Sequence, residues 1–97
     1  MKAYIKQELP EQAHEAIAIV GCESGFNPEA KNPNSTATGL GQWIKGSWIL
    51  YRRLMGRDTD PELRKNWIEN LDTLIFARKY EGDWGNWLAS INCHGYY

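Results

Sequence analysis

The sequence predicts a mainly helical domain of the α+β class, with about four or more helices and one polar excursion. Apolar residues recur three and four positions apart over most of the chain, while Gly, Pro, Asn and Asp divide it into segments of helix length. Residues 27–43 are instead rich in Asn, Pro, Ser, Thr and Gly, which is typical of an irregular loop or a small β-hairpin. The chain of 97 residues has the length of one domain. We expect a single domain over residues 1–97, with residues 1–8 a flexible or peripheral segment.

The first predicted helix covers residues 10–24. Pro10 and Glu11 suit its first turn, because Pro is tolerated there and an acid interacts favourably with the helix dipole. Gly25 is a typical helix stop, and Pro28 prevents the helix from resuming. One stripe of the helix is apolar and faces the core: Ala13, Ala16, Ile17 and Val20.

Three more helices are predicted after the polar segment. Ser47 can cap a helix over residues 48–55 that ends before a glycine. The longest helix opens at Asp60 and runs to residue 81, with one apolar face throughout. Asp83 can cap the last helix, in which apolar residues follow the i, i+3, i+4, i+7 pattern: Trp84, Trp87, Leu88 and Ile91.

Aromatic residues are frequent, with five Trp, five Tyr and two Phe. This content suits either a compact core or a surface that stacks on sugar rings, and composition alone does not separate the two. Trp43 lies outside the predicted helices, and we weigh sugar stacking and core packing equally for it. The other four tryptophans fall on helical stripes and are expected in the core: Trp48, Trp67, Trp84 and Trp87.

The net charge of −1 gives no reason to expect nucleic acid as a partner, because such binding depends on many Lys and Arg contacts to phosphate. Residues 45–65 carry six basic residues against three acidic ones, which favours a solvated helical surface over a basic patch for an acidic polymer. No apolar run is long enough to span a bilayer, and no signal peptide is visible at the start. Export by another route, or a leader or further domain beyond this chain, is the expectation.

Glu23 is the candidate catalytic residue. It lies in the last turn of the first predicted helix, one turn after Ile19 and Val20 and two turns after Ala16. Apolar neighbours and the negative end of the helix dipole both disfavour a charged carboxylate. Such an acid would keep a proton for a poor leaving group such as a glycosidic oxygen. The alternative is an acid at a wet, frayed helix end, which is ordinary when Glu23 is considered alone.

Two ordered motifs resemble the signature of the transglycosylase SLT domain, the lytic transglycosylases related to goose-type lysozyme. The first, ESGFNPEAKNPNSTATGLGQW at residues 23–43, is similar in its Glu-Ser pair, its following aromatic, Pro and Ala, and its Gly-Leu-x-Gln end. The second, KYEGDWGNWLASINCHG at residues 79–95, is similar in its Tyr, its Gly-Asp pair and its closing Asn and Gly. Ile91 stands where the family usually has Tyr. The resemblance covers about residues 9–97 and implies a lysozyme-like fold, with the helices around a small β-hairpin.

The resemblance also implies roles for individual residues. Glu23 would act first as acid and then as base, with Ser24 close to the reacting sugar. Gln42 would line the groove floor, and Asn92 would close in from the other side. The plainer alternatives are that Ser24 bonds the backbone of its own helix and that Gln42 is an ordinary loop amide. Tyr96 is a weaker candidate than Trp43 for stacking on the substrate.

The implied substrate is the MurNAc-GlcNAc β-1,4 bond of peptidoglycan glycan strands. The only other acid in residues 27–43 is Glu29, near the entry of the loop, so a second catalytic carboxyl is not evident. This favours attack by the sugar's own N-acetyl oxygen, after which Glu23 reclaims a proton from the C6 hydroxyl and a 1,6-anhydro end forms. If a water held by Thr36 or Thr38 reacts instead, the same site is a hydrolytic muramidase. A non-catalytic glycan-binding or structural module of the same fold is the third alternative.

The expected place of action is the cell wall, as an extracellular, periplasmic or phage-associated protein. We expect no cofactor and no metal, because the spacings of His14 and His94 to the cysteines match no common zinc pattern. If the two motifs meet in space, Cys22 and Cys93 could form a disulfide, which would imply an oxidising compartment. The alternative of two buried free thiols stays open at this point. The sequence gives no oligomeric state.

Overall fold

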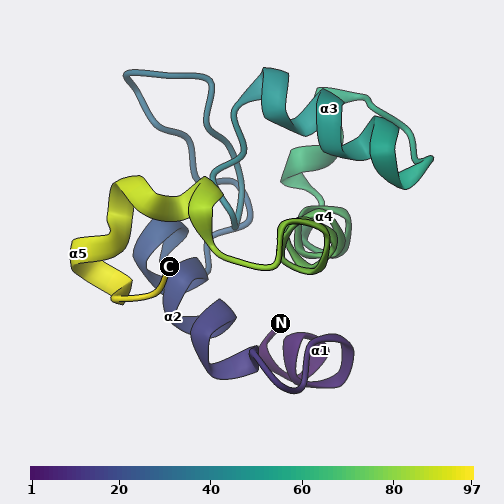
Figure 1. The fold of residues 1–97 in the computed structure, drawn as a ribbon. Coiled ribbons are helices and arrows are strands. Elements are labelled where there is room, and N and C mark those ends of the chain that lie inside the picture. The colour runs from purple at the N-terminus through teal and green to yellow at the C-terminus, as the bar shows by residue number, and fades with distance from the viewer.

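Five α-helices and two 3-10 helices surround a single core in the computed structural model (Figure 1), which describes residues 1–97. In chain order the elements are α1 (Lys2–Glu8), α2 (Ala13–Ser24), α3 (Lys45–Met55), η1 (Pro61–Lys65), α4 (Trp67–Glu81), η2 (Gly85–Ser90) and α5 (Ile91–His94). Helix α4 packs against α3 and α1, while α2 packs against α1, η2 and α5. The predicted mainly helical class is confirmed.

Residues 27–44 run as an irregular loop with no named strand. Two isolated antiparallel bridges are its only β-type pairings, between Lys31 and Thr38 and between Thr38 and Trp43. Left-handed backbone at Gly39 and Gln42, with φ of 82° and 51°, turns the chain too sharply for a longer ladder. The sequence predicted either an irregular loop or a small β-hairpin here, and the structure contains the irregular loop.

The N-terminal segment is part of the core, which corrects the expectation that residues 1–8 are flexible or peripheral. Ile5 and Leu9 lie four residues apart on one face, and they are 0% and 2% exposed. Tyr4 packs its ring edge-on against Trp67, with the ring centroids 5.7 Å apart. Only these two strongly apolar residues mark the buried face of α1, so the helix has a weak pattern in the sequence.

The predicted third helix, residues 61–81, is divided at Asn66. Asp60 accepts a hydrogen bond from the backbone of Glu62 at 3.0 Å and starts η1. Asn66 then has extended backbone and accepts from the backbone N–H groups of Ile68 and Glu69, so that α4 begins at Trp67. Two caps in succession therefore produce two helices from one apolar pattern.

The second and last predicted helices also differ at their starts. Helix α3 begins at Lys45, and its first N–H donates to Thr36 Oγ1 at 3.0 Å, so Ser47 lies inside the helix instead of capping it. Asp83 accepts from the backbone of Gly85 at 2.9 Å as expected, but the segment that follows is the 3-10 helix η2 and the short α5. Leu88 consequently points outward and is 45% exposed.

Aromatic rings form much of the core. Trp48 and Trp84 are fully buried, Trp87 is 4% exposed, and Trp67 is partly buried against the same cluster. The ring of Trp43 lies in their midst, 5.3 Å from Trp87 between centroids. The helical stripes therefore predicted the burial of Trp48, Trp84 and Trp87, while Trp67, expected in the core, is only partly buried.

Two of the six basic residues in 45–65 hold parts of the fold together. Arg52 is 1% exposed, and its guanidinium donates to the carbonyl of Asp58, to Thr73 and to Glu69 at 2.8, 3.2 and 2.6 Å. Arg64 donates to the carbonyls of Thr36, Trp43 and Pro61. These two cations hold loops together, while Lys45, Arg53, Arg57 and Lys65 are exposed, as expected of a solvated surface. No helix in the structure has the length and apolar content needed to cross a membrane.

Asn70 attaches the loop to α4, and its removal is expected to lower stability. Its side chain is fully buried, accepts from the N–H of Gly41 at 2.9 Å and donates to the carbonyl of Arg64 at 2.8 Å. Asn70→Ala leaves these buried groups without partners, so we expect the free energy of unfolding to fall by about 2–3 kcal/mol. Urea denaturation measures this change. The exposed Asn34→Ala is the matched control, for which a change below about 0.5 kcal/mol is expected.

Candidate functional site

Glu23 lies in the last turn of α2 and is half-buried. The residues one and two turns before it, Ile19, Val20 and Ala16, are all fully buried, so its stem leaves the helix beside the core. Glu23 Oε2 accepts a hydrogen bond from Ser90 Oγ at the end of η2. The carboxyl is therefore held between two elements and is not at a frayed, wet helix end.

A disulfide joins the two motifs beside this carboxyl. Cys22 and Cys93 are bonded, with their Cα atoms 6.0 Å apart. Neither cysteine is free, so the bonded pair is the alternative that the structure contains. Figure 1 shows the resulting arrangement, in which α5 lies beside α2 although 71 residues separate the two sulfurs in the sequence. The first and second motifs thus meet where Glu23 is placed.

Ser24 and Gln42 make the backbone contacts that are expected if the first bonds its own helix and the second is an ordinary loop amide. Ser24 Oγ donates to the carbonyl of Val20 at 3.1 Å, within its own helix. Gln42 Nε2 donates to the carbonyls of Ala30 and Gly39 at 3.1 and 3.0 Å, which draws the two ends of the loop together. Both side chains have structural partners, and Gln42 also borders the smaller of the two cavities described below.

Trp43 and Thr38 are interior residues. Trp43 is 3% exposed and Thr38 is 1% exposed, and the hydroxyl of Thr38 donates to the carbonyl of Thr36 at 3.0 Å. Trp43 therefore presents no open ring face for a sugar to stack on, and Thr38 has no contact with solvent through which to hold a reacting water. Core packing, the second alternative considered for Trp43, is what the structure contains.

Asn92 and Tyr96 lie near the C-terminus. Asn92 is exposed on α5, one residue before the disulfide. Tyr96 is half-buried between two imidazoles, parallel to His94 and edge-on to His14, with centroids 6.4 Å apart in both pairs. His94 is buried and its Nε2 lies 2.9 Å from the carbonyl of Trp87. The two histidines are thus separate packing groups, and no group of three or more His, Cys, Asp or Glu side chains is arranged to hold a metal ion.

Ser90 is the site residue that sequence analysis missed. It lies three residues before Cys93, which is about one helical turn. Because Cys22 is next to Glu23, a residue one turn before Cys93 is well placed to face that carboxyl once the disulfide forms. This spacing was available in the sequence, but it becomes informative only when the pairing of the cysteines is known.

A small cavity lies between the loop, the start of α3 and η2. Its volume is about 120 Å³, and Gly41, Gln42 and Trp43 border it on the loop side. Ser47 borders it from α3, and Asn86 and Trp87 from η2. No charged residue lines it. The same η2 that supplies Asn86 and Trp87 supplies Ser90 to Glu23, although Glu23 itself borders neither cavity.

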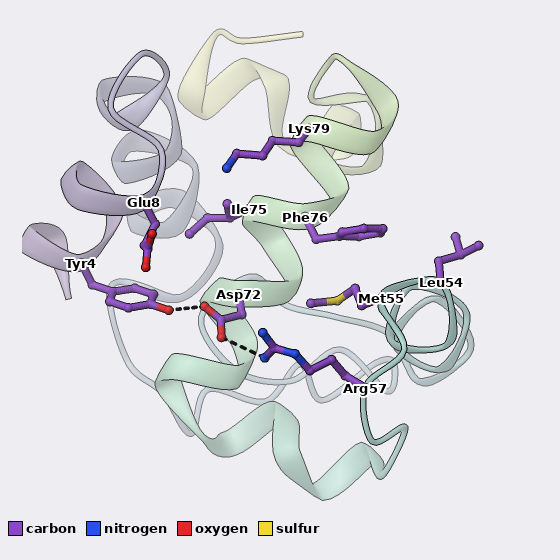
Figure 2. A pocket seen from close by; sticks show the side chains of 9 residues that line it. All are labelled: Tyr4, Glu8, Leu54, Met55, Arg57, Asp72, Ile75, Phe76 and Lys79. Atoms are coloured by element: carbon purple, nitrogen blue, oxygen red, sulfur yellow. Dashed lines mark hydrogen bonds and ion pairs between the residues drawn. The ribbon is translucent and has the colours of Figure 1, made fainter.

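A larger cavity of about 410 Å³ lies between α1, α4 and the end of α3 (Figure 2). None of the residues expected from the sequence to contact substrate lines it. At its base Tyr4 donates a hydrogen bond to Asp72, whose other oxygen lies 3.2 Å from Arg57. These three polar groups pair with one another at the base of the cavity.

The pairing at this base predicts a loss of stability in alkaline solution. The hydrogen bond to Asp72, burial and the negative charges of Asp72 and Glu8 raise the pKa of Tyr4 from its ordinary value of 10.0 to about 12. The folded protein keeps this proton longer than the unfolded chain does, so the contribution is fully present below pH 10 and is lost between about pH 10 and 12. Urea denaturation at pH 9, 10 and 11 should show wild type losing stability more steeply than Tyr4→Phe. Parallel losses in the two proteins would contradict the assignment.

Comparison with known proteins gives no match. No protein-family model, curated protein or solved structure matches this chain.

Proposed function

We propose that this chain is a peptidoglycan-cleaving lytic transglycosylase of lysozyme-like fold, which breaks the MurNAc-GlcNAc β-1,4 bond with Glu23 as its single acid and base. One observation carries the proposal. The carboxyl at the end of α2 is faced by Ser90 and flanked by a disulfide to α5, so the two segments that resemble the SLT signature converge on Glu23.

The reaction needs a proton donor and then an acceptor at one place. Protonated Glu23 gives its proton to the glycosidic oxygen as the bond to the anomeric carbon breaks, while the substrate's N-acetyl oxygen attacks that carbon from the other face. The Glu23 carboxylate then takes the proton from the C6 hydroxyl, whose oxygen displaces the N-acetyl oxygen and closes the 1,6-anhydro ring. Ser90 holds Oε2, which leaves Oε1 for these transfers.

The surrounding acids support substrate assistance. Glu29 is exposed near the entry of the loop, and Asp83 accepts a hydrogen bond from the backbone N–H of Gly85. Neither carboxyl takes part in the hydrogen bond between Ser90 and Glu23. A conventional glycosidase needs a second carboxyl positioned to attack or to activate water. A disulfide also fits work outside the reducing cytosol, in agreement with action at the cell wall.

Product analysis on purified sacculi tests the proposal. Wild type should release muropeptides whose anhydro ends are lighter by one water than hydrolytic ends, and Glu23→Gln should release none. Ends of normal mass would show a hydrolytic muramidase on the same bond. Full activity of Glu23→Gln would show that the acid is another residue.

A non-catalytic glycan-binding module of the same fold is the second candidate. Glu23 borders neither cavity, and Ile91 occupies the place of a Tyr in the motif that the second segment resembles. This candidate predicts co-sedimentation of wild type and Glu23→Gln alike with sacculi, and no new chain ends from either protein.

A further inference from the structure

The larger cavity has an apolar wall built by two helices. Leu54 and Met55 come from the end of α3, and Ile75 and Phe76 come from α4 (Figure 2). Leu54 is 46% exposed and Phe76 is partly buried, so part of this apolar surface is open to solvent. The volume of about 410 Å³ lies within the roughly 300–1,000 Å³ that is typical of small-molecule sites. The cavity therefore has the size and the apolar wall that a small ligand requires.

The charged groups at the base of the cavity already have partners. Tyr4 donates to one oxygen of Asp72, and Arg57 Nη1 lies 3.2 Å from the other. The same Nη1 lies 3.9 Å from Glu69, so the charge of Arg57 is balanced within the protein. The base thus contributes no unpaired charge to the cavity.

Two other charges at the cavity have no ionic partner. Glu8 is the last residue of α1, and Lys79 lies in the last turn of α4. Both line the cavity, and Figure 2 shows their side chains above the contact of Tyr4 with Asp72. Glu8 and Lys79 form an ion pair neither with each other nor with any other side chain. The cavity therefore offers one unpaired anion and one unpaired cation beside its apolar wall.

These two charges select the class of ligand. A neutral apolar ligand would cover Glu8 and Lys79 and give neither of them a partner, which costs free energy. A ligand with only a carboxylate would pair with Lys79 and be repelled by Glu8, and a ligand with only an ammonium group would do the reverse. A zwitterion supplies both charges, and an apolar substituent on it would cover the wall formed by Met55 and Phe76. An α-amino acid with an apolar side chain has all three features.

We propose that the cavity between α1, α3 and α4 binds a zwitterionic amino acid with an apolar side chain. Its ammonium group contacts Glu8, its carboxylate contacts Lys79, and its side chain packs on Met55 and Phe76. This site is separate from the candidate catalytic site, because Glu23 borders neither cavity. The inference therefore does not depend on the proposed function.

Three ligands with the same apolar side chain test this inference in the wild-type protein. Phenylalanine is a zwitterion, N-acetylphenylalanine has no ammonium group, and phenylalaninamide has no carboxylate. At about pH 6, where the α-amino group is protonated, each derivative should bind about fivefold more weakly than phenylalanine, as expected for the loss of one exposed ion pair.

Methyl signals in ¹H–¹³C spectra measure this binding and locate it. Phenylalanine should shift the methyl signals of Leu54, Met55 and Ile75, which line the cavity. Leu88 on η2 is the internal control, because it is 45% exposed, nearly as much as Leu54, and lies outside the cavity. A shift at Leu88 as large as that at Leu54 would show contact of the ligand with any exposed apolar side chain, which would contradict the inference.

Two variants should change these preferences selectively. Glu8→Gln should weaken binding of phenylalanine and leave that of N-acetylphenylalanine unchanged, because the acetylated ligand has no ammonium group to lose a partner. Lys79→Gln should weaken binding of phenylalanine and leave that of phenylalaninamide unchanged. A merely structural effect would weaken all three ligands together. Glu11→Gln and Lys45→Gln, at exposed positions outside the cavity, are the matched controls and should keep the wild-type preferences.

Several results would overturn the inference. These are unshifted cavity methyl signals at the solubility limit of phenylalanine, equal binding of the three ligands by wild type, or wild-type preferences in both Glu8→Gln and Lys79→Gln. Larger shifts with N,N′-diacetylchitobiose than with phenylalanine would assign the cavity to a sugar and would also contradict it. Glu23→Gln should bind phenylalanine as wild type does, so a failure of the proposed function and a failure of this inference are distinguishable.

Discussion

Replacing both cysteines, as Cys22→Ser with Cys93→Ser, is expected to lower the free energy of unfolding by about 4 kcal/mol. The bond closes a loop of 71 residues in sequence separation, so it removes much conformational freedom from the unfolded chain. A domain of 97 residues has a modest core and depends more on such a bond than a larger protein does. Urea denaturation of the oxidised protein and the double variant measures the difference. A change below about 1 kcal/mol would contradict this expectation.

The same variant should loosen the candidate site before the rest of the fold. Helix α5 has four residues, which is too short to be stable without tertiary contacts, and Cys93 anchors it to α2. Hydrogen exchange should therefore accelerate in η2 and α5 more than in α4, and the contact of Ser90 with Glu23 should weaken. Wild type in reductant is the matched control and should exchange as the double variant does. Equal acceleration in all helices would indicate global unfolding instead.

The sequence predicted helices where local signals suffice. Gly25, Gly56 and Gly82 each end a helix in left-handed backbone, with φ of 60°, 71° and 79°, and those three ends were located correctly. The first residues of the helices were less predictable. At α4, the cap at Asn66 interrupts an apolar pattern that continues unbroken in the sequence, and at α3, the start at Lys45 depends on Thr36 in the preceding loop. The loop over residues 27–44 required long-range information, since Asn70 and Arg64 determine its path.

The candidate site was predictable to a smaller extent. Glu23 was singled out from its local position and from the resemblance, and its role stays a prediction. The sequence left a disulfide between Cys22 and Cys93 and two free thiols equally open, and the structure contains the disulfide. Trp43 shows the limit of such reasoning, because a Trp beside a loop amide can be either a surface platform or a core ring. Its burial follows from contacts with Trp48, Tyr51 and Trp87, which lie 5 to 44 residues further along the chain. Pairwise contacts of this kind leave no local signal.

Glu23→Gln is expected to lower the rate of glycan cleavage at least about 100-fold, the low end of the contribution of general acid–base groups. Glutamine has nearly the same shape and can still accept from Ser90, but it has no proton to give to the leaving oxygen and cannot take one from the C6 hydroxyl. The release of anhydro-muropeptides from sacculi at matched protein concentration measures the rate. Thermal unfolding should show stability within about 0.5 kcal/mol of wild type.

Ser90→Ala separates positioning of the carboxyl from proton transfer by it. The variant removes the hydrogen bond to Oε2 and leaves the acid itself in place, so we expect a loss of about tenfold, equivalent to the roughly 1.4 kcal/mol of one hydrogen bond. Rescue of the rate by Ser90→Thr, which restores the hydroxyl, would distinguish positioning from a general effect of the substitution. If Ser90→Ala and Glu23→Gln lost activity equally, the hydroxyl would take part in the reaction directly. If Ser90→Ala had no effect, the contact between η2 and α2 would be structural only, and Glu23 would need another group to orient it toward the sugar.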